Sequence, residues 1–245
     1  LEEEWPTPNR YRTAAGAPGP DYYQQQADYR MEIVLDDERQ TITGNEVITY
    51  TNNAPESLEY LWVQLDQNMR DPEGLTARKI TGKLPSKEES WRMRRLFPDF
   101  PGGFKLETVE GMDGKALDVA VNYTMMRIDL KEPLQSGEEF EFRIKWSYNI
   151  NDRMQIGGRS GYEYFAEDGN YLYTIAQFFP RMAVYNDVYG WQNKQFLGRG
   201  EFTLPFGDYD VKITVPADHV VGATGRLQNE KDVLSSAQRK RMEKA

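Results

Sequence analysis

The feature that most constrains this sequence is a strict alternation of apolar and polar residues along much of its length. Residues 139–150 show it most clearly, because every second position there is apolar: Phe140, Phe142, Ile144, Trp146, Tyr148 and Ile150. Successive side chains of a β-strand point to opposite faces, so each such run predicts a strand with one buried and one solvated face. Strands of this kind are typical of antiparallel sheets.

A period of two also appears in five shorter runs, at residues 29–35, 61–65, 117–121, 126–130 and 209–215. Turn-forming residues separate the runs. The pair Asp113-Gly114 is the clearest, because glycine accepts the positive φ of a tight turn, and we expect a hairpin that joins residues 104–110 to 115–121. The sequence therefore predicts an all-β fold, an antiparallel β-sandwich with minor helical insertions and a C-terminal helical tail.

Residues that interrupt regular structure, and residues that begin helices, divide the chain into three segments. Residues 1–27 are rich in proline and glycine and predict an irregular arm, either disordered or pinned to the body by its aromatic residues. Residues 28–227 are expected to form a single β-domain. Residues 228–245 predict a linker and a helix that Ser235 or Ser236 caps. Because this helical pattern reaches Ala245 without a stop signal, we expect an excised part of a longer protein.

One insertion within the β-domain carries its own signals. The sequence Ser86-Lys87-Glu88-Glu89 can begin a short helix as a capping box. Three arginines follow it, Arg92, Arg94 and Arg95. We interpret them as a solvated helix face, with an anion site as the alternative.

Composition excludes several kinds of chemistry. The 245 residues include no Cys and one His, His219, so a zinc site with two His or Cys ligands cannot be assembled from this chain. Asp218 precedes His219 directly, and in an extended segment their side chains would point apart, so we interpret His219 as structural. A formal net charge of −9 argues against a nucleic-acid partner. No run approaches the ~18 apolar residues of a membrane helix, and the absence of Cys favours a periplasmic or exported protein over a cytoplasmic one.

Residues 162–191 form an aromatic-rich segment, in which ten of 30 residues are Tyr, Phe or Trp. Gly157, Gly158 and Gly161 precede it and allow close approach of the backbone. Such a segment is either part of the core or a surface that contacts a ligand.

Residues 171–187, with the sequence YLYTIAQFFPRMAVYND, resemble the N-terminal domain of aminopeptidase N-like zinc metallopeptidases, and most closely a bacterial branch of that family. Residues 29–50, 58–67 and 207–224 are similar to other strands of that domain, in the same order. The resemblance covers roughly residues 20–227. It implies a saddle-shaped β-domain that caps a downstream catalytic domain.

The resemblance also implies what the chain lacks. In this family the catalytic domain supplies a Gly-x-Met-Glu-Asn loop and a His-Glu-x-x-His zinc helix, and neither motif occurs here. We therefore expect a non-catalytic domain without a metal or cofactor of its own. The parent protein is expected to be a zinc metalloaminopeptidase, a hydrolase. The expected partners are its own catalytic domain and the amino terminus of a peptide substrate.

Three residues are carried over as substrate-binding residues. Gln177 occupies the place where relatives have a Gln or Glu that meets the substrate's amino terminus, and Phe178 and Phe179 lie beside it. We expect Gln177 at a strand end that faces the catalytic domain. Ile175 stands where relatives often have a second Gln, and a neutral amide at Gln177 offers hydrogen bonds but no ion pair.

Two other functions are compatible with the residues themselves. One is a stand-alone carbohydrate- or peptide-binding β-sandwich module that uses the aromatic segment. The other is a small hydrolase that uses a pair of carboxylates, which sequence cannot locate among 39 acidic residues.

Overall fold

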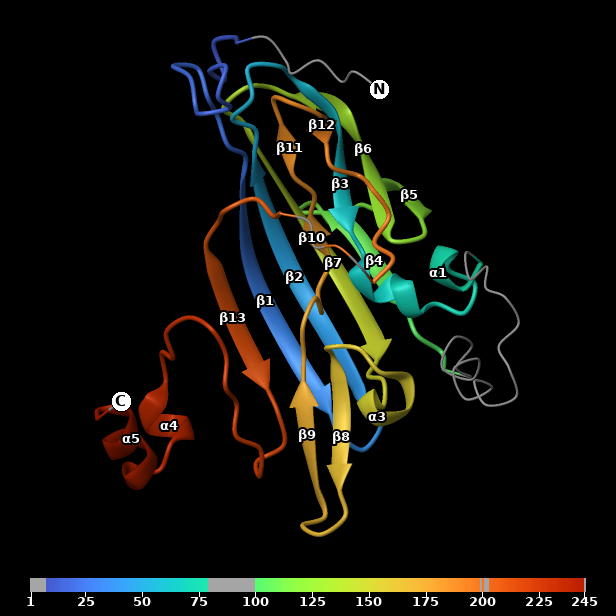
Figure 1. The fold of residues 1–245 in the computed structure, drawn as a ribbon, viewed down its shortest axis with the longest axis vertical. Helices are drawn as coiled ribbons and strands as arrows, with labels where there is room; N and C mark the ends of the chain where they lie inside the picture. Colours follow the sequence, from blue (N-terminus) through green and yellow to red (C-terminus); the bar gives the residue numbers. More distant parts are fainter. Residues whose placement is uncertain (1–7, 79–99, 199, 201–202, 245) are drawn as a thin grey trace. The chain divides into compact units, whose positions relative to one another are not determined.

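The computed structural model describes residues 8–78, 100–198, 200 and 203–244. They belong to two compact units, Leu1–Thr214 and Val215–Ala245. Figure 1 shows the helices and strands of both units.

The larger unit consists mainly of strands joined by short turns. Its strands of six or more residues are β1 (Gln26–Asp36), β2 (Thr41–Thr51), β3 (Leu58–Gln64), β4 (Lys105–Gly111), β6 (Met125–Leu134), β7 (Glu139–Asn149) and β13 (Tyr209–Thr214). Its shorter strands are β5 (Asp118–Asn122), β8 (Gly161–Phe165), β9 (Asn170–Thr174), β10 (Arg181–Met182), β11 (Tyr185–Asn186) and β12 (Gly190–Trp191). Its helical segments are η1 (Asp66–Arg70), α1 (Leu75–Arg78) and α3 (Arg153–Ile156).

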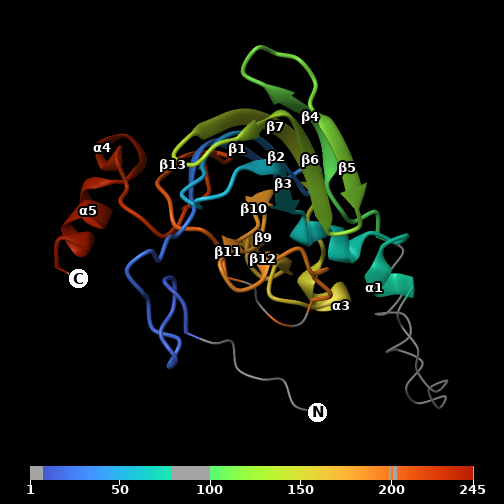
Figure 2. The same cartoon turned by 90° about the horizontal axis from the view of Figure 1, so that it is seen from above.

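Two sheets form the body of this unit (Figures 1 and 2). The larger has the strand order β13-β1-β2-β7-β4, and the smaller has the order β10-β3-β6-β5. Every pairing within them is antiparallel except that of β1 with β13. The predicted all-β, mainly antiparallel architecture is therefore confirmed.

One hydrophobic core is shared by strands of both sheets. Phe142, Ile144 and Trp146 of β7 are at most 1% exposed, and they belong to the same cluster as Leu61 of β3 and Ile128 of β6. Lys145, between two of these positions, is exposed. The alternation in residues 139–150 therefore gives the correct face and register for β7.

The turn at Asp113-Gly114 is present, and the hairpin predicted around it forms only in its first few residues. Gly111 N donates to Lys115 O at 2.9 Å, Glu110 bridges Ala116, and Leu117 N donates to Val109 O at 3.0 Å. Beyond this point β4 pairs with β7 and β5 pairs with β6, so the two strands belong to different sheets. Each pairs with a longer strand, β7 with 11 residues and β6 with ten, and the two strands therefore continue into separate sheets.

The expectation of a buried face in residues 209–215 is also wrong. Tyr209, Val211 and Ile213 are level with buried residues of β1, yet they are 47%, 37% and 41% exposed. The reason is position, because β13 is the edge strand of the larger sheet and, within the described residues, its side chains have a neighbouring strand, β1, on one side only.

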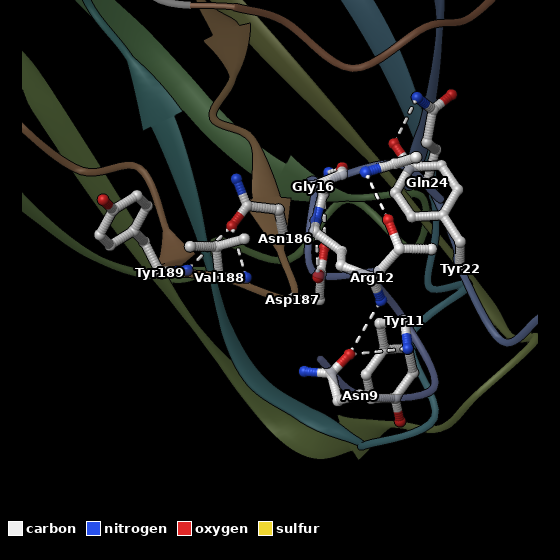
Figure 3. A network of polar contacts seen from close by, with 12 residues as sticks. Asn9, Tyr11, Arg12, Gly16, Tyr22, Gln24, Asn186, Asp187, Val188 and Tyr189 are labelled. Atoms are coloured by element: carbon white, nitrogen blue, oxygen red, sulfur yellow. Dashed lines mark hydrogen bonds and ion pairs between the residues drawn. The ribbon is translucent and has the colours of Figure 1, made fainter. Parts of the chain in front are cut away.

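The described part of the N-terminal arm is irregular and folds back on itself (Figure 3). Asn9 Oδ1 accepts hydrogen bonds from the amides of Tyr11 and Arg12, both at 2.8 Å. The guanidinium of Arg12 donates to both carboxylate oxygens of Asp187, at 2.8 and 2.9 Å. This ion pair fastens the arm to the turn between β11 and β12.

The smaller unit contains α4 (Glu230–Val233) and α5 (Ser236–Met242). Ser235 caps α5 through a reciprocal capping box with Gln238, as predicted. Residues 216–219 form a turn, in which His219 N donates to Pro216 O at 3.0 Å. The turn brings His219 Nδ1 to 2.9 Å from Asp218 Oδ1, so the expectation that these side chains point apart is wrong. The capping box and arginines expected at residues 86–95 lie outside the described residues.

Candidate functional site

Gln177 lies in the connection between β9 and β10, three residues after β9 ends at Thr174. The expectation that it lies at a strand end is therefore wrong. Its φ is +51°, in the left-handed region that residues other than glycine seldom adopt. A backbone in this conformation must be held by its surroundings.

The main chain at Gln177 is held by a side chain from η1. Gln67 Nε2 donates to the carbonyl of Gln177 at 2.9 Å and to that of Ala176 at 3.3 Å. On the other side, the amide of Ala176 donates to Ser160 Oγ at 3.3 Å. Gln67 is 3% exposed and Ser160 is 6% exposed, so these contacts are shielded from water.

A second tie joins η1 to the other end of this connection. Asp66 forms an ion pair with Arg181, the first residue of β10, and their side chains are 2% and 14% exposed. Burial raises the pKa of Asp66, and the charge of Arg181 opposes this rise. The connection that carries Gln177 is thus fixed by η1 at two points.

Phe178 and Phe179 are half-buried and pack on the core. Phe178 contacts Trp146, with ring centroids 6.5 Å apart, and Phe179 contacts Tyr29 at 5.5 Å. The two phenylalanine rings meet edge to face at 5.0 Å. They therefore anchor the segment that follows Gln177, and only part of each ring is available to a ligand.

The side-chain amide of Gln177 is half-buried and has no hydrogen-bond partner among the described residues. The bond to Gln67 uses only its main-chain carbonyl. The backbone of Gln177 is therefore constrained, while its side-chain carbonyl oxygen and its two N–H groups are free to hydrogen-bond a polar ligand.

The aromatic segment divides into a buried and an exposed part. Tyr185 and Trp191 pack against the core. In the β8–β9 hairpin, Tyr164, Phe165 and Tyr171 are 55%, 42% and 40% exposed, and the rings of Tyr164 and Tyr171 lie 4.9 Å apart. The prediction of core residues is thus confirmed for one part of the segment, and the prediction of a ligand-contacting surface remains for the exposed part.

The described residues do not fit a zinc site. No group of three or more His, Asp or Glu side chains suited to a metal ion exists within the described residues. Glu46 is a buried carboxylate, fully within the core, and burial raises its pKa well above the ordinary value. Its oxygens have no hydrogen-bond partner in the described part of the chain, but a single carboxylate supplies one ligand where zinc needs three or four.

Sequence reasoning missed the residues that position the connection. Gln67 and Asp66 follow β3 in a polar run where the alternation simply stops, and no sequence signal marks them as buried. Arg181 lies in the Phe-Pro-Arg sequence of the aromatic segment, but its partner is 115 residues away. Contacts over such separations have no local signature.

No protein-family model matches the chain, and no curated protein matches it. Solved structures of M1 zinc metallopeptidase from Deinococcus radiodurans are similar to this chain, with low sequence identity and low TM-scores. A mutant bound to a Tyr-Ser-Ala substrate has 13% identity, a TM-score of 0.43, and coverage of 87% of this chain and 38% of that chain. The protein without a stated mutation has 14% identity, a TM-score of 0.43, and coverage of 86% and 37%. The chain thus spans less than two fifths of the length of these structures.

No helix within the described residues is long and apolar enough to cross a membrane.

Proposed function

We propose that this chain is the non-catalytic N-terminal β-domain of a zinc-dependent aminopeptidase of the bacterial branch named above. In this proposal it covers the downstream catalytic domain and lines the site that receives the amino terminus of a peptide substrate. Gln177 is the contact residue, with Phe178 and Phe179 beside it. Zinc belongs to the parent protein's catalytic domain and to no residue of this chain.

The observation that carries the proposal is the state of Gln177. An exopeptidase must recognise a free amino terminus, and recognition needs an acceptor on a rigid support. The main-chain carbonyl of Gln177 accepts a hydrogen bond from Gln67, and its side-chain amide forms no hydrogen bond with any described residue. Its Oε1 can accept from an ammonium group, whereas its NH2 group cannot, so the contribution is that of one hydrogen bond.

The experiment is an assay of the whole protein to which this chain belongs. We expect it to hydrolyse aminoacyl p-nitroanilides, to lose activity with a chelator and to regain it with zinc. The 245-residue chain alone should hold no stoichiometric, chelator-resistant zinc by elemental analysis. A parent protein without peptidase activity, or a stable zinc ion in the chain alone, would overturn the proposal.

A second function is favoured by the exposed aromatic surface of the β8–β9 hairpin. Tyr164 and Tyr171 are paired across the hairpin, and their exposed rings, 4.9 Å apart, are of the kind that stacks on sugars or on apolar peptide side chains. In this alternative the chain is a binding module in its own right. Saturable binding of the chain to one class of ligand on a glycan or peptide array, lost in Tyr171→Ala, would support it.

A further inference from the structure

We propose that Gln67 is a positioning residue, whose carboxamide holds the main chain of Ala176 and Gln177 in the conformation that presents Gln177. This inference rests on the function proposed above for Gln177. The positioning itself is a property of the chain and can be measured without any enzymatic activity.

The hydrogen bonds of Gln67 fix the direction of its carboxamide. Its Oε1 accepts from Arg70 Nη1 at 3.0 Å, and a guanidinium can only donate, so this oxygen must face Arg70. Its Nε2 must then face the carbonyls of Gln177 and Ala176, to which it donates at 2.9 and 3.3 Å. Both ends of one buried amide are therefore used, in one orientation only.

The conformation that Gln67 holds is one that the chain would not choose alone. A residue with a Cβ is unfavourable at positive φ, and Gln177 has a φ of +51°. Gln67 lies in η1, which the Asp66–Arg181 ion pair also joins to the start of β10. The helical segment η1 thus holds the connection between β9 and β10 at two points, and Gln67 makes the contact with Gln177.

Arg70 makes the arrangement testable with a near-isosteric change. Burial lowers the pKa of Arg70, and it forms no ion pair with a carboxylate among the described residues. In Gln67→Glu, the new carboxylate would pair well with Arg70. Its other oxygen, however, would face two carbonyl oxygens and could donate to neither. Shape and the Arg70 contact are retained, whereas the donation to the Gln177 segment is lost and is replaced by repulsion between oxygens.

The experiment is amide hydrogen exchange on the 245-residue chain, read at two amides. Ala176 N donates to Ser160 Oγ at 3.3 Å and reports on the connection, and Met182 N donates to the hydroxyl of Tyr29 at 2.9 Å and reports on the core. In Gln67→Glu we expect Ala176 to exchange at least about tenfold faster, because the hydrogen bonds to both carbonyls are lost, and Met182 to be unchanged. The control is Gln135→Glu, because Gln135 Nε2 also donates to a carbonyl, that of Pro133 at 3.0 Å, but in an exposed turn.

Unchanged exchange at Ala176 in Gln67→Glu would overturn the inference. Equal acceleration at Ala176 and Met182 would also overturn it, because Gln67 would then stabilise the whole fold and not this segment. In the whole protein, kcat/KM should fall in Gln67→Glu, and adding Gln177→Ala should cause little further loss. If Ala176 responds as expected but Gln177→Ala leaves kcat/KM unchanged, the positioning role stands and the proposed function fails.

Discussion

Gly44 and Trp146 face each other across the β2–β7 pairing, and the indole ring occupies the space that a side chain at position 44 would need. A Cβ added to Gly44 would lie 2.2 Å from Trp146 Cζ2. Trp146, the largest fully buried side chain among the described residues, therefore fits only because its partner has no side chain.

We expect Gly44→Ala to destabilise the domain by about 1–3 kcal/mol, the usual cost of overpacking a closed core. Trp146→Phe, which shortens the ring, should recover part of this loss in the double variant. Denaturant titrations of both single variants and the double variant measure the coupling. Additive losses would show that the two positions do not compete for the same space.

Ile144 and Lys145 test the register of β7. Ile144 is fully buried, and Ile144→Ala should cost about 2–5 kcal/mol through lost burial and the cavity left behind. Lys145 is exposed, and Lys145→Ala should change the free energy of unfolding by less than about 0.5 kcal/mol. Equal losses in chemical denaturation would contradict the assigned faces of the strand.

The buried Glu46 should make stability fall as pH rises. Its pKa in the folded protein is raised well above the ordinary value by burial. Below the unfolded-state value of about 4.3 the group is protonated in both states. Above it, only the unfolded state gains from ionisation, and stability is lost as pH rises toward the folded-state pKa.

Glu46→Gln should remove this dependence. The melting temperatures of Glu46→Gln and the unaltered protein should be close at pH 4, and the variant should be the more stable at pH 8. Glu132→Gln, at an exposed position of β6, is the control and should match the unaltered protein at both pH values. A difference between Glu46→Gln and the unaltered protein that does not grow with pH would contradict a neutral Glu46.

Arg12 should be needed to hold the N-terminal arm. Asp187 is 4% exposed and Arg12 is its ion-pair partner, so Arg12→Ala leaves a shielded carboxylate and should cost about 1–3 kcal/mol. Residues 8–25 should then be cleaved sooner in limited proteolysis. Arg10→Ala breaks the more exposed pair with Asp21, within the arm itself, and should leave attachment of the arm unchanged. Equal cleavage rates in Arg12→Ala and the unaltered protein would mean that other contacts hold the arm.

Sequence alone could predict the strands because burial of one face makes every second residue apolar. Strand β7 follows that pattern at every position from Phe142 to Tyr148. It could not predict which strands pair. The Asp113-Gly114 turn is local, whereas the assignment of β4 and β5 to different sheets depends on β6 and β7. For the candidate site, resemblance indicated Gln177, but its left-handed backbone and the hydrogen bonds from Gln67 depend on a segment 110 residues away.

The most direct test of the account is the activity of Gln177→Ala in the whole protein, measured on substrates with a free amino terminus. We predict that kcat/KM falls by the equivalent of about 1–3 kcal/mol of transition-state binding, because one acceptor for the ammonium group is lost. The melting temperature should be nearly unchanged, because the amide of Gln177 has no partner among the described residues. Gln135→Ala should leave both quantities as they are. Full activity in Gln177→Ala, with the fold intact, would contradict the claim that this residue receives the substrate's amino terminus.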